Sequence, residues 1–202
     1  MNNILLTSIG LTSRQLRSFV SDFKKRKNSK TVLIITTANT LKEFNPLALL
    51  TYAHFLSIGF KSRNIFFHDI EKNSNPKTET DILFVCGGNS FELLYQAQKC
   101  NFKEYIRSII DGGGLYIGSS AGSILLAPSV FIASQINPDR DKRELQSYSG
   151  LNVVNTTIFP HYKPKYEFQI RSFEIHIKER VVRVSDGQGA LCDENKLIKV
   201  IG

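Results

Sequence analysis

Short, mostly apolar runs recur along the chain, and longer stretches of mixed polar and apolar residues separate them. The runs occupy residues 4–7, 31–37, 64–68, 81–86 and 115–117. They are rich in Val, Ile and Leu, and both faces of the resulting strand would be apolar. Each run therefore predicts a strand, and the runs at 31–37 and 115–117 predict buried ones.

The segment after the first run has the spacing of an amphipathic helix. Leu16, Phe19, Val20 and Phe23 recur at intervals of three and four residues, so they lie on one side of a helix. Ser13 stands in front of this pattern, where its hydroxyl can accept a hydrogen bond from a free backbone N–H. The pattern predicts a helix with Ser13 as its N-cap.

A second helix is predicted to begin at Pro46, a residue favoured in the first helical turn, and to end near Gly59. Its predicted apolar face consists of Leu49, Tyr52, Ala53 and Leu56. Further helices are predicted at residues 91–99, 103–110 and 166–180, further strands at 156–162, 181–184 and 196–200, and a turn at 185–190.

Strands that alternate with helices indicate an α/β fold. The pattern predicts a mostly parallel sheet flanked by helices on both faces. No internal repeat, low-complexity tract or linker divides the sequence, so residues 1–202 are predicted to form one domain. Ligands of such sheets bind at the carboxyl ends of the strands, so functional residues are expected there.

A glycine-rich corner follows the run at 115–117. Residues 118–122 read Gly-Ser-Ser-Ala-Gly, with Ser120 at the centre of a Gly-x-Ser-x-Gly frame. In a strand–turn–helix corner this spacing exposes the central hydroxyl, and the free amides of the new helix face any oxyanion formed beside it. Ser120 is therefore a candidate nucleophile, although a serine at this place can also serve only as a helix cap.

A second corner lies at residues 87–92, at the end of the run at 81–86. Asn89 and Glu92 have the spacing of a capping box for the next helix, and Gly88 has an amide that no helix uses. In a parallel sheet this corner shares an edge with Ser120, so the N–H groups of Gly88 and Ala121 are a candidate oxyanion hole. A glycine turn without any ligand is the alternative interpretation.

Four histidines are candidates for a base that activates Ser120. His54 and His176 lie within predicted helices, and His68 ends the third predicted strand. His161 follows Pro160 at the carboxyl end of a predicted strand, which places it at the same edge as Ser120. His161 is therefore the predicted general base, which accepts the serine proton and later delivers it to a leaving amine.

The charge and the cysteines limit the possible classes of function. The net charge is +8, from 26 Lys and Arg against 18 Asp and Glu, and much of the excess lies at residues 24–30, the predicted end of a helix. Without aromatic residues interleaved in a basic patch, the charge does not predict nucleic-acid binding. The three cysteines have neither metal-binding nor disulfide spacing. No metal or cofactor is expected, and neither is a membrane span; a cytoplasmic protein is expected.

Taken together, three segments resemble the peptidase E (aspartyl dipeptidase) family, whose fold is similar to that of class I glutamine amidotransferases. They are GGNSF at 87–91, GSSAG at 118–122 and FPHY at 159–162. TTAN at 36–39 and SDGQG at 185–189 also match, so the resemblance spans nearly the whole chain. It implies that Ser120 is the nucleophile, His161 the base, and Gly88 with Ala121 the oxyanion donors.

The third member of the triad departs from the family pattern. The resemblance implies an acidic residue in the loop after the nucleophile helix, but an ungapped count from Ser120 arrives at Gln135. Asp139 is therefore the predicted acid, and Asp141 and Glu167 are alternatives. The loop at 137–144 is also predicted to cover the site.

The resemblance further implies a serine dipeptidase that acts on short peptides with an amino-terminal Asp, as a monomer or homodimer. Such a substrate needs a cation for its side-chain carboxylate, and the predicted substrate-binding residues are Asn89, Arg171 and Arg140. The alternatives are a non-catalytic pseudo-peptidase that binds a peptide, an esterase, and a cyanophycin-type hydrolase on the same scaffold.

Overall fold

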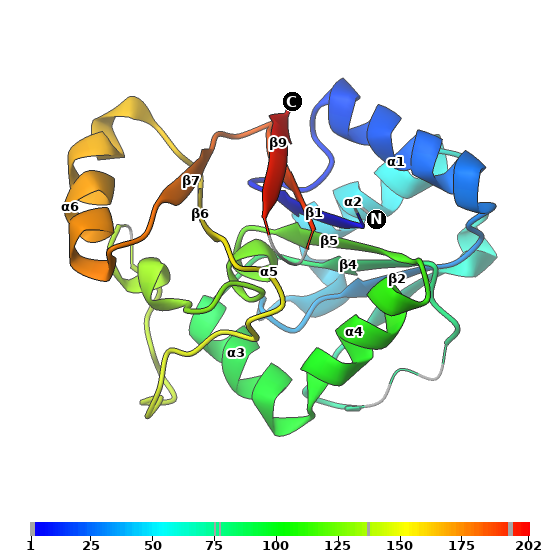
Figure 1. The fold of residues 1–202 in the computed structure, drawn as a ribbon. Coiled ribbons are helices and arrows are strands. Elements are labelled where there is room, and N and C mark those ends of the chain that lie inside the picture. The colour runs from blue at the N-terminus through cyan, green and yellow to red at the C-terminus, as the bar shows by residue number, and fades with distance from the viewer. Residues whose placement is uncertain (1–2, 75, 77, 137, 194–195) are drawn as a thin grey trace.

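A seven-stranded sheet runs through the centre of the computed structural model, which describes residues 3–74, 76, 78–136, 138–193 and 196–202 (Figure 1). The strand order is β3-β2-β4-β5-β1-β8-β9. The strands are β1 (Ile4–Thr7), β2 (Val32–Ile35), β3 (Ile65–His68), β4 (Ile82–Val85), β5 (Leu115–Ser119), β8 (Gly189–Cys192) and β9 (Leu197–Ile201). Strands β1 to β5 pair in parallel, whereas β8 and β9 are antiparallel additions at one edge.

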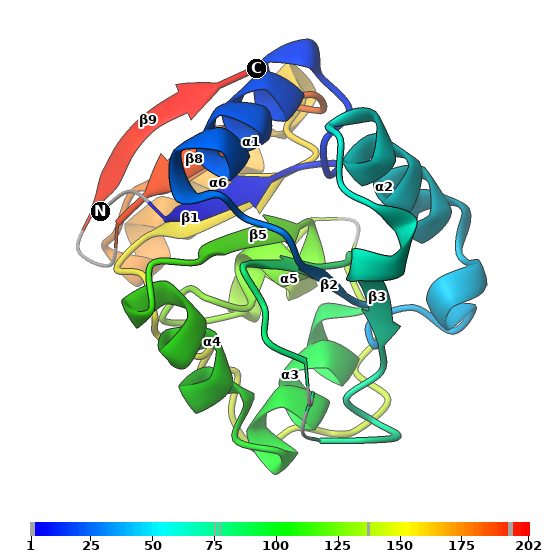
Figure 2. The same ribbon diagram turned by 90° about the vertical axis from the view of Figure 1, so that its right-hand side faces the viewer.

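Helices cover both faces of this sheet, as Figures 1 and 2 show from two directions. Helices α1 (Arg14–Lys27) and α2 (Pro46–Ser57) lie on one face, and α3 (Ser90–Lys99), α4 (Phe102–Asp111) and the short α5 (Ala121–Ile124) lie on the other. The predicted fold class, an α/β fold with a mostly parallel sheet flanked by helices on both faces, is confirmed.

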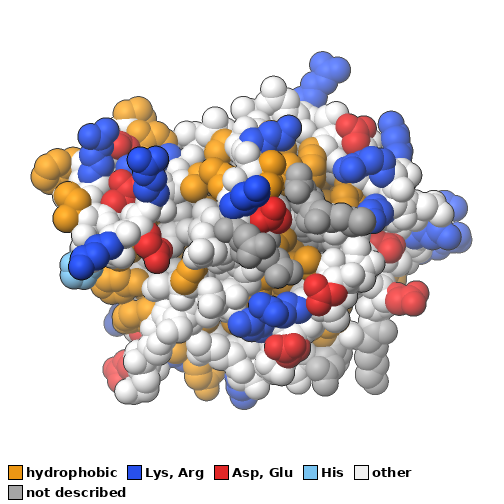
Figure 3. Space-filling model, in the orientation of Figure 1, with side chains coloured by type: hydrophobic (Ala, Val, Ile, Leu, Met, Phe, Trp, Pro, Cys, Tyr) orange, Lys and Arg blue, Asp and Glu red, His pale blue; other side chains and the backbone are white. Residues whose placement is uncertain are grey.

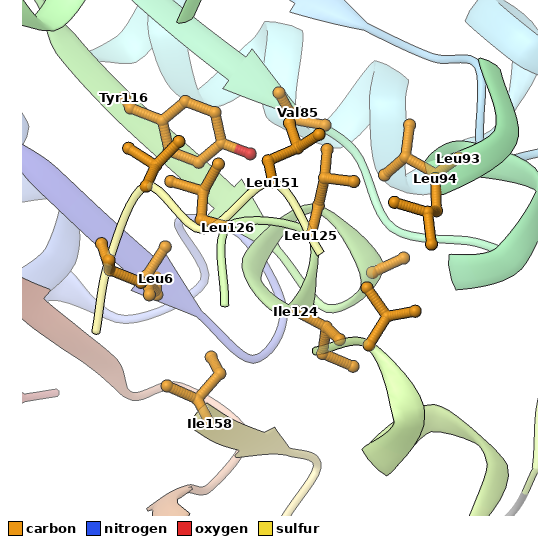
Figure 4. Close-up of a cluster of buried hydrophobic side chains, with 14 of the residues drawn as sticks. Leu6, Val85, Leu93, Leu94, Tyr116, Ile124, Leu125, Leu126, Leu151 and Ile158 are labelled. Atoms are coloured by element: carbon orange, nitrogen blue, oxygen red, sulfur yellow. The ribbon is translucent and has the colours of Figure 1, made fainter. Parts of the chain in front are cut away.

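Alternate residues of each central strand enter two separate cores. In β1, Ile4 and Leu6 pack among side chains of one face while Leu5 packs among those of the other. This follows from the two-residue period of a strand and explains why the runs are apolar throughout. Around α5, Ile124 and Leu125 pack with Leu6 and their neighbours in the first core (Figure 4).

The predicted apolar face of α2 differs from the face that is buried. Ala48, Thr51 and Phe55 are the buried residues of this helix, whereas Leu49 and Leu56 are exposed. Because apolar residues surround nearly the whole helix, the sequence pattern does not distinguish its inner side from its outer side. The packing of Phe55 against Phe60 and Phe84 fixes the orientation instead.

The carboxyl-terminal third of the chain contains a second, small sheet. Strands β6 (Thr157–Pro160) and β7 (Val181–Val184) pair in parallel, and α6 (Glu167–Ile177) connects them at one side of the molecule (Figure 1). Short 3-10 helices occur at η1 (Lys42–Phe44), η2 (Ser62–Asn64), η3 (Phe131–Ser134) and η4 (Pro164–Tyr166). The predicted turn at 185–190 is too long, because β8 begins at Gly189.

Within the described part of the chain, no helix combines the length and the apolar composition needed to cross a membrane. Of the loop predicted to cover the site, Asn137 lies outside the described residues.

Candidate active site

Ser120 stands at a sharp turn between β5 and α5. Its backbone has φ 49° and ψ −111°, a conformation that is strained for a residue with a side chain. The turn is held by hydrogen bonds from Ser120 N to Thr7 O (3.0 Å) and from Ser123 Oγ to Thr7 O (2.8 Å). The predicted strand–turn–helix corner is therefore present, and its strain raises the Ser120 hydroxyl above the strand end.

The glycines of the corner are required by close backbone packing. A Cβ added at Gly118 would lie 2.6 Å from Gly122 O, and one added at Gly122 would lie 2.2 Å from Val85 O. Real Cβ contacts are longer than this, so any side chain at either position would push α5 away from β4 and β5. The Gly-x-Ser-x-Gly frame is explained by packing as well as by exposure of the hydroxyl.

His161 is within hydrogen-bond distance of Ser120. It follows β6 in a left-handed backbone conformation, φ 57°, and its Nε2 lies 2.9 Å from Ser120 Oγ. Strand β6 belongs to the small sheet and not to the sheet of β5, so the two residues do not share a sheet edge as expected. The chain reversal at His161 brings the imidazole back to Ser120.

Asp186 contacts the other nitrogen of the imidazole. Its Oδ1 lies 2.8 Å from His161 Nδ1 and also accepts a hydrogen bond from Ser8 Oγ at 2.7 Å. Ser8, which is buried at the end of β1, in turn accepts a hydrogen bond from His161 N at 2.8 Å. Ser120, His161 and Asp186 thus form a continuous hydrogen-bonded chain, and Ser8 connects its last two members.

The electrostatic environment keeps Asp186 ionised. Partial burial by itself raises the pKa of this carboxyl, but the hydrogen bonds from Ser8 and His161 favour the carboxylate, and the net pKa is below its ordinary value. An ionised acid at Nδ1 requires the proton of a neutral imidazole to sit there, which leaves Nε2 free to accept from Ser120.

The structure places Asp139, the predicted acid, elsewhere. Its Oδ2 accepts a hydrogen bond from Ser90 N at 2.8 Å, at the start of α3, and its N–H donates to Ala133 O. Neither Asp139 nor the alternatives contact His161: Asp141 accepts from Arg143 N and Leu145 N in its own loop. The count from Ser120 could not find Asp186, because that residue lies 25 positions after His161 in the sequence.

Glu167, the other alternative, belongs to an ionic cluster at α6. Its carboxylate accepts hydrogen bonds from Arg171, Arg183 and Tyr162. The hydrogen bonds from the two guanidinium groups lower the pKa of Glu167 to about 2. This carboxylate therefore joins α6 to β7 and is occupied by its own partners.

The two candidate oxyanion donors are unoccupied in the described part of the chain. Gly88 N donates no backbone hydrogen bond there, and Ala121 N, in the first turn of α5, has no helical acceptor. Gly88 adopts φ 146°, and a Cβ added to it would lie 2.1 Å from Ala38 O. A Cβ added at the neighbouring Gly87 would lie 3.0 Å from Ser120 Cβ, so this corner packs directly against the serine.

Two cavities meet at the hydrogen-bonded chain, and Gly88, Ser120 and His161 line both. The first, about 310 Å³, also contains Lys42 and Cys86 and is called the Lys42 pocket. The second, about 220 Å³, also contains Asp139 and is called the Asp139 pocket. A bound peptide that passes Ser120 therefore has a cavity on each side of this residue.

The predicted substrate-binding residues lie outside both cavities. Arg171 is at the surface of α6, with a side chain that is 72% exposed and paired with Glu167; Figure 3 shows basic and hydrophobic side chains together on this side of the molecule. Arg140 and Asn89 line a third, charged cavity, which shares Lys42 with the Lys42 pocket, and Asn89 Nδ2 donates to Arg140 O there. Asn89 Oδ1 caps α3 as predicted, but Asn89 N donates to Ala38 O and not to Glu92, so the capping box is half formed.

Ser8 and Asp186 are the two site residues that the sequence analysis missed. The segment SDGQG at 185–189 is part of the resemblance to the peptidase E family, but the sequence analysis gave no role to its aspartate. Among the described residues, no group of three His, Cys, Asp or Glu side chains is arranged to hold a metal ion.

Comparisons with known proteins show the family. The model of "Peptidase family S51" matches residues 4–202. An uncharacterized peptidase of Listeria monocytogenes is 27% identical over 164 residues, which are 80% of this chain and 78% of the relative. Peptidase E of Streptomyces coelicolor is 37% identical over 84 residues, 42% of this chain and 33% of that protein.

The fold also matches solved structures. The crystal structure of a Listeria monocytogenes protein assigned to peptidase E has a TM-score of 0.77 and 24% identity, covering 99% of this chain and 98% of the other. A peptidase from an acI-B1 actinobacterium has a TM-score of 0.70 and 16% identity, covering 98% and 86%. At these identities the similarity concerns the fold alone.

Proposed function

The chain belongs to peptidase family S51, and we propose that it is a serine-type peptidase that hydrolyses short peptides through Ser120, His161 and Asp186. The observation that carries the proposal is the continuous hydrogen-bonded chain, with 2.9 Å between Ser120 and His161 and 2.8 Å between His161 and Asp186. A nucleophile, a base that contacts it and an acid that orients the base are the parts of a catalytic triad.

The proposed reaction proceeds through an acyl-enzyme. Ser120 Oγ attacks the scissile carbonyl carbon while His161 Nε2 takes the hydroxyl proton, and the same proton passes to the leaving amine as the C–N bond breaks. A water molecule then attacks the ester in the same way and releases the amino-terminal product. Asp186 holds the Nδ1–H tautomer and stabilises the imidazolium that forms in each step.

The amides of Gly88 and Ala121 are proposed as the oxyanion hole. Both N–H groups flank Ser120, and neither has a backbone acceptor among the described residues. Such donors stabilise the negative oxygen of the tetrahedral intermediate, where one donor is typically worth about 10²- to 10³-fold in rate.

An amino-terminal Asp would require a cation close to its side chain. Among the described residues that line the two pockets, the one Lys or Arg is Lys42, whose ammonium lies 2.7 Å from Glu71 and 3.2 Å from Asp69. Two carboxylates already neutralise it. The proposed substrate class is therefore short peptides, without a preference for amino-terminal Asp.

Labelling with a fluorophosphonate tests the proposed nucleophile. The wild type should be labelled on Ser120, and Ser120→Ala should lose both the label and the hydrolysis of short peptides. Ser119→Ala is the matched control, because Ser119 Oγ accepts from Gly10 N and not from the site. Equal losses in both variants, or no label in the wild type, would contradict the proposal.

The assembled chain of hydrogen bonds argues against a pseudo-peptidase with a decayed triad. A p-nitrophenyl ester and a poly-Asp backbone carrying Arg side chains separate the remaining alternatives. A serine peptidase should turn over short peptides more efficiently than either compound, whereas an esterase or a cyanophycin-type hydrolase should prefer its own substrate.

A further inference from the structure

We propose that the Asp139 pocket binds the amino-terminal residue of the substrate, that its apolar wall selects an apolar side chain there, and that the Asp139 carboxylate pairs with the α-ammonium. This inference rests on the proposed serine-peptidase function, because it assigns the substrate to one side of Ser120. It gives Asp139 a role in specificity that differs from that of Asp186.

The position of the scissile bond follows from the residues that the two pockets share. Gly88, Ser120 and His161 line both, so the reacting carbonyl lies at their junction. The residue that becomes the acyl group then occupies one pocket, and the leaving amine extends into the other. The charges of the two pockets indicate which one binds the amino-terminal residue.

The two pockets differ in charge, because Asp69 and Glu71 neutralise Lys42 whereas no cation lines the described part of the Asp139 pocket. Among the described lining residues, the Asp139 pocket has one carboxylate and neither Lys nor Arg, whereas the Lys42 pocket has one cation and neither Asp nor Glu. The free amino group of a short peptide is positively charged and loses hydration when it enters a pocket, so it needs a carboxylate partner. The amino-terminal residue is therefore assigned to the Asp139 pocket.

The Asp139 carboxylate is held in place with one oxygen available. Oδ2 accepts from Ser90 N at 2.8 Å, and the backbone N–H of the same residue donates to Ala133 O at 2.9 Å. Oδ1 carries no hydrogen bond from the described part of the chain. A fixed carboxylate with a free oxygen suits an ammonium donor, because little side-chain entropy remains to be lost on binding.

Away from Ser90, Ser120, His161 and Asp139, most of the side chains that line the pocket are apolar. Its apolar wall consists of Ile124, Ile132, Ala133, Ile136, Phe159 and Tyr166. An apolar side chain gains free energy by leaving water here, whereas an Asp side chain would lose hydration and face the like charge of Asp139. The volume of about 220 Å³ is below the roughly 300–1,000 Å³ of sites for drug-sized ligands, so the pocket suits a single residue.

The experiment measures kcat and KM for Leu-Gly, Asp-Gly and N-acetyl-Leu-Gly. The wild type should prefer Leu-Gly to Asp-Gly by roughly ten- to a hundred-fold in kcat/KM, the range expected from burying one apolar side chain. It should also prefer the free to the acetylated peptide, because acetylation removes the ammonium.

Asp139→Asn keeps an acceptor for Ser90 N but removes the charge. It should raise KM for Leu-Gly by roughly ten-fold or more with a small change in kcat, and should lower the preference for free over acetylated peptide. Glu144→Gln is the matched control, since it removes the same charge from the same loop at a residue that lines neither pocket. Its kinetics should equal those of the wild type.

Three results would overturn the inference without affecting the serine mechanism. They are a wild-type preference for Asp-Gly, equal turnover of free and acetylated peptide, and an unchanged free-to-acetylated ratio in Asp139→Asn. The first two need no variant, so a failure of Asp139→Asn to fold does not remove the test. If fluorophosphonate does not label Ser120 and no peptide is cleaved, the proposed function fails and this inference fails with it.

Discussion

Ser8 Oγ accepts a hydrogen bond from His161 N at 2.8 Å and donates one to Asp186 at 2.7 Å, although 153 and 178 residues separate these pairs along the chain. One buried hydroxyl at the end of β1 thus fixes both the base and the acid relative to the central sheet. Strand β1 pairs with β5, and Ser120 directly follows β5. The positions of Ser120, His161 and Asp186 are therefore all fixed relative to these two strands.

The first prediction concerns this hydroxyl. Ser8→Ala removes a hydrogen bond to a charged acceptor, worth about 1.5–3 kcal/mol, so kcat should fall roughly ten- to a hundred-fold while KM changes little. Ser13→Ala is the control: it removes the cap of α1, which costs about 1 kcal/mol of stability, and should leave kcat unchanged. Equal kcat values for wild type and Ser8→Ala would exclude a positioning role.

The second prediction separates the two aspartates. Asp186→Asn keeps the shape of the side chain but favours the wrong tautomer of His161, so kcat should fall by about 10³- to 10⁴-fold. Asp139→Asn should keep kcat within a few-fold of the wild type. Steady-state kinetics on one dipeptide decides between them, and a large loss of kcat in Asp139→Asn alone would restore Asp139 as the orienting acid.

The third prediction concerns pH and the cluster at α6. The pKa of Glu167 is about 2, lowered from 4.5 by hydrogen bonds from Arg171 and Arg183. A carboxyl whose pKa is lower in the folded state stabilises the fold above its unfolded pKa, and this contribution is lost as the pH falls toward the folded value. The Tm of the wild type should exceed that of Glu167→Gln at neutral pH, and the difference should disappear between about pH 4.5 and 2. A difference in Tm that is independent of pH would show that the charge is not responsible.

The fourth prediction concerns the thiol in the Lys42 pocket. Burial raises the pKa of Cys86 to about 12, so almost no reactive thiolate is present at neutral pH. Incubation with iodoacetamide at pH 8 should therefore leave most of the peptidase activity, whereas a fluorophosphonate should abolish it. Rapid inactivation by iodoacetamide, with mass spectrometry locating the adduct on Cys86, would contradict this account.

Local spacing in the sequence was sufficient to predict most of the elements, although not β8, and the two corners. The apolar runs gave the strands because a strand buried on both faces has few places for a polar residue, and the Gly-x-Ser-x-Gly frame located Ser120 because Gly118 and Gly122 must let backbones approach. His161 was predicted from its position after Pro160. These features depend on neighbours within a few residues, so the sequence displays them directly.

The partners that join across long stretches of chain were decided only by the tertiary structure. Asp186 reaches His161 because β7 lies beside β6 and the turn after β7 returns to the end of β1, which no local pattern records. The position of Ser8 beside His161 and Asp186 is likewise decided by the tertiary structure. So is the position of Arg171, whose side chain is exposed and lies outside both pockets. The acid was predicted in the loop after the nucleophile helix, from the resemblance and a count from Ser120, but the distance between side chains depends on how the strands pair.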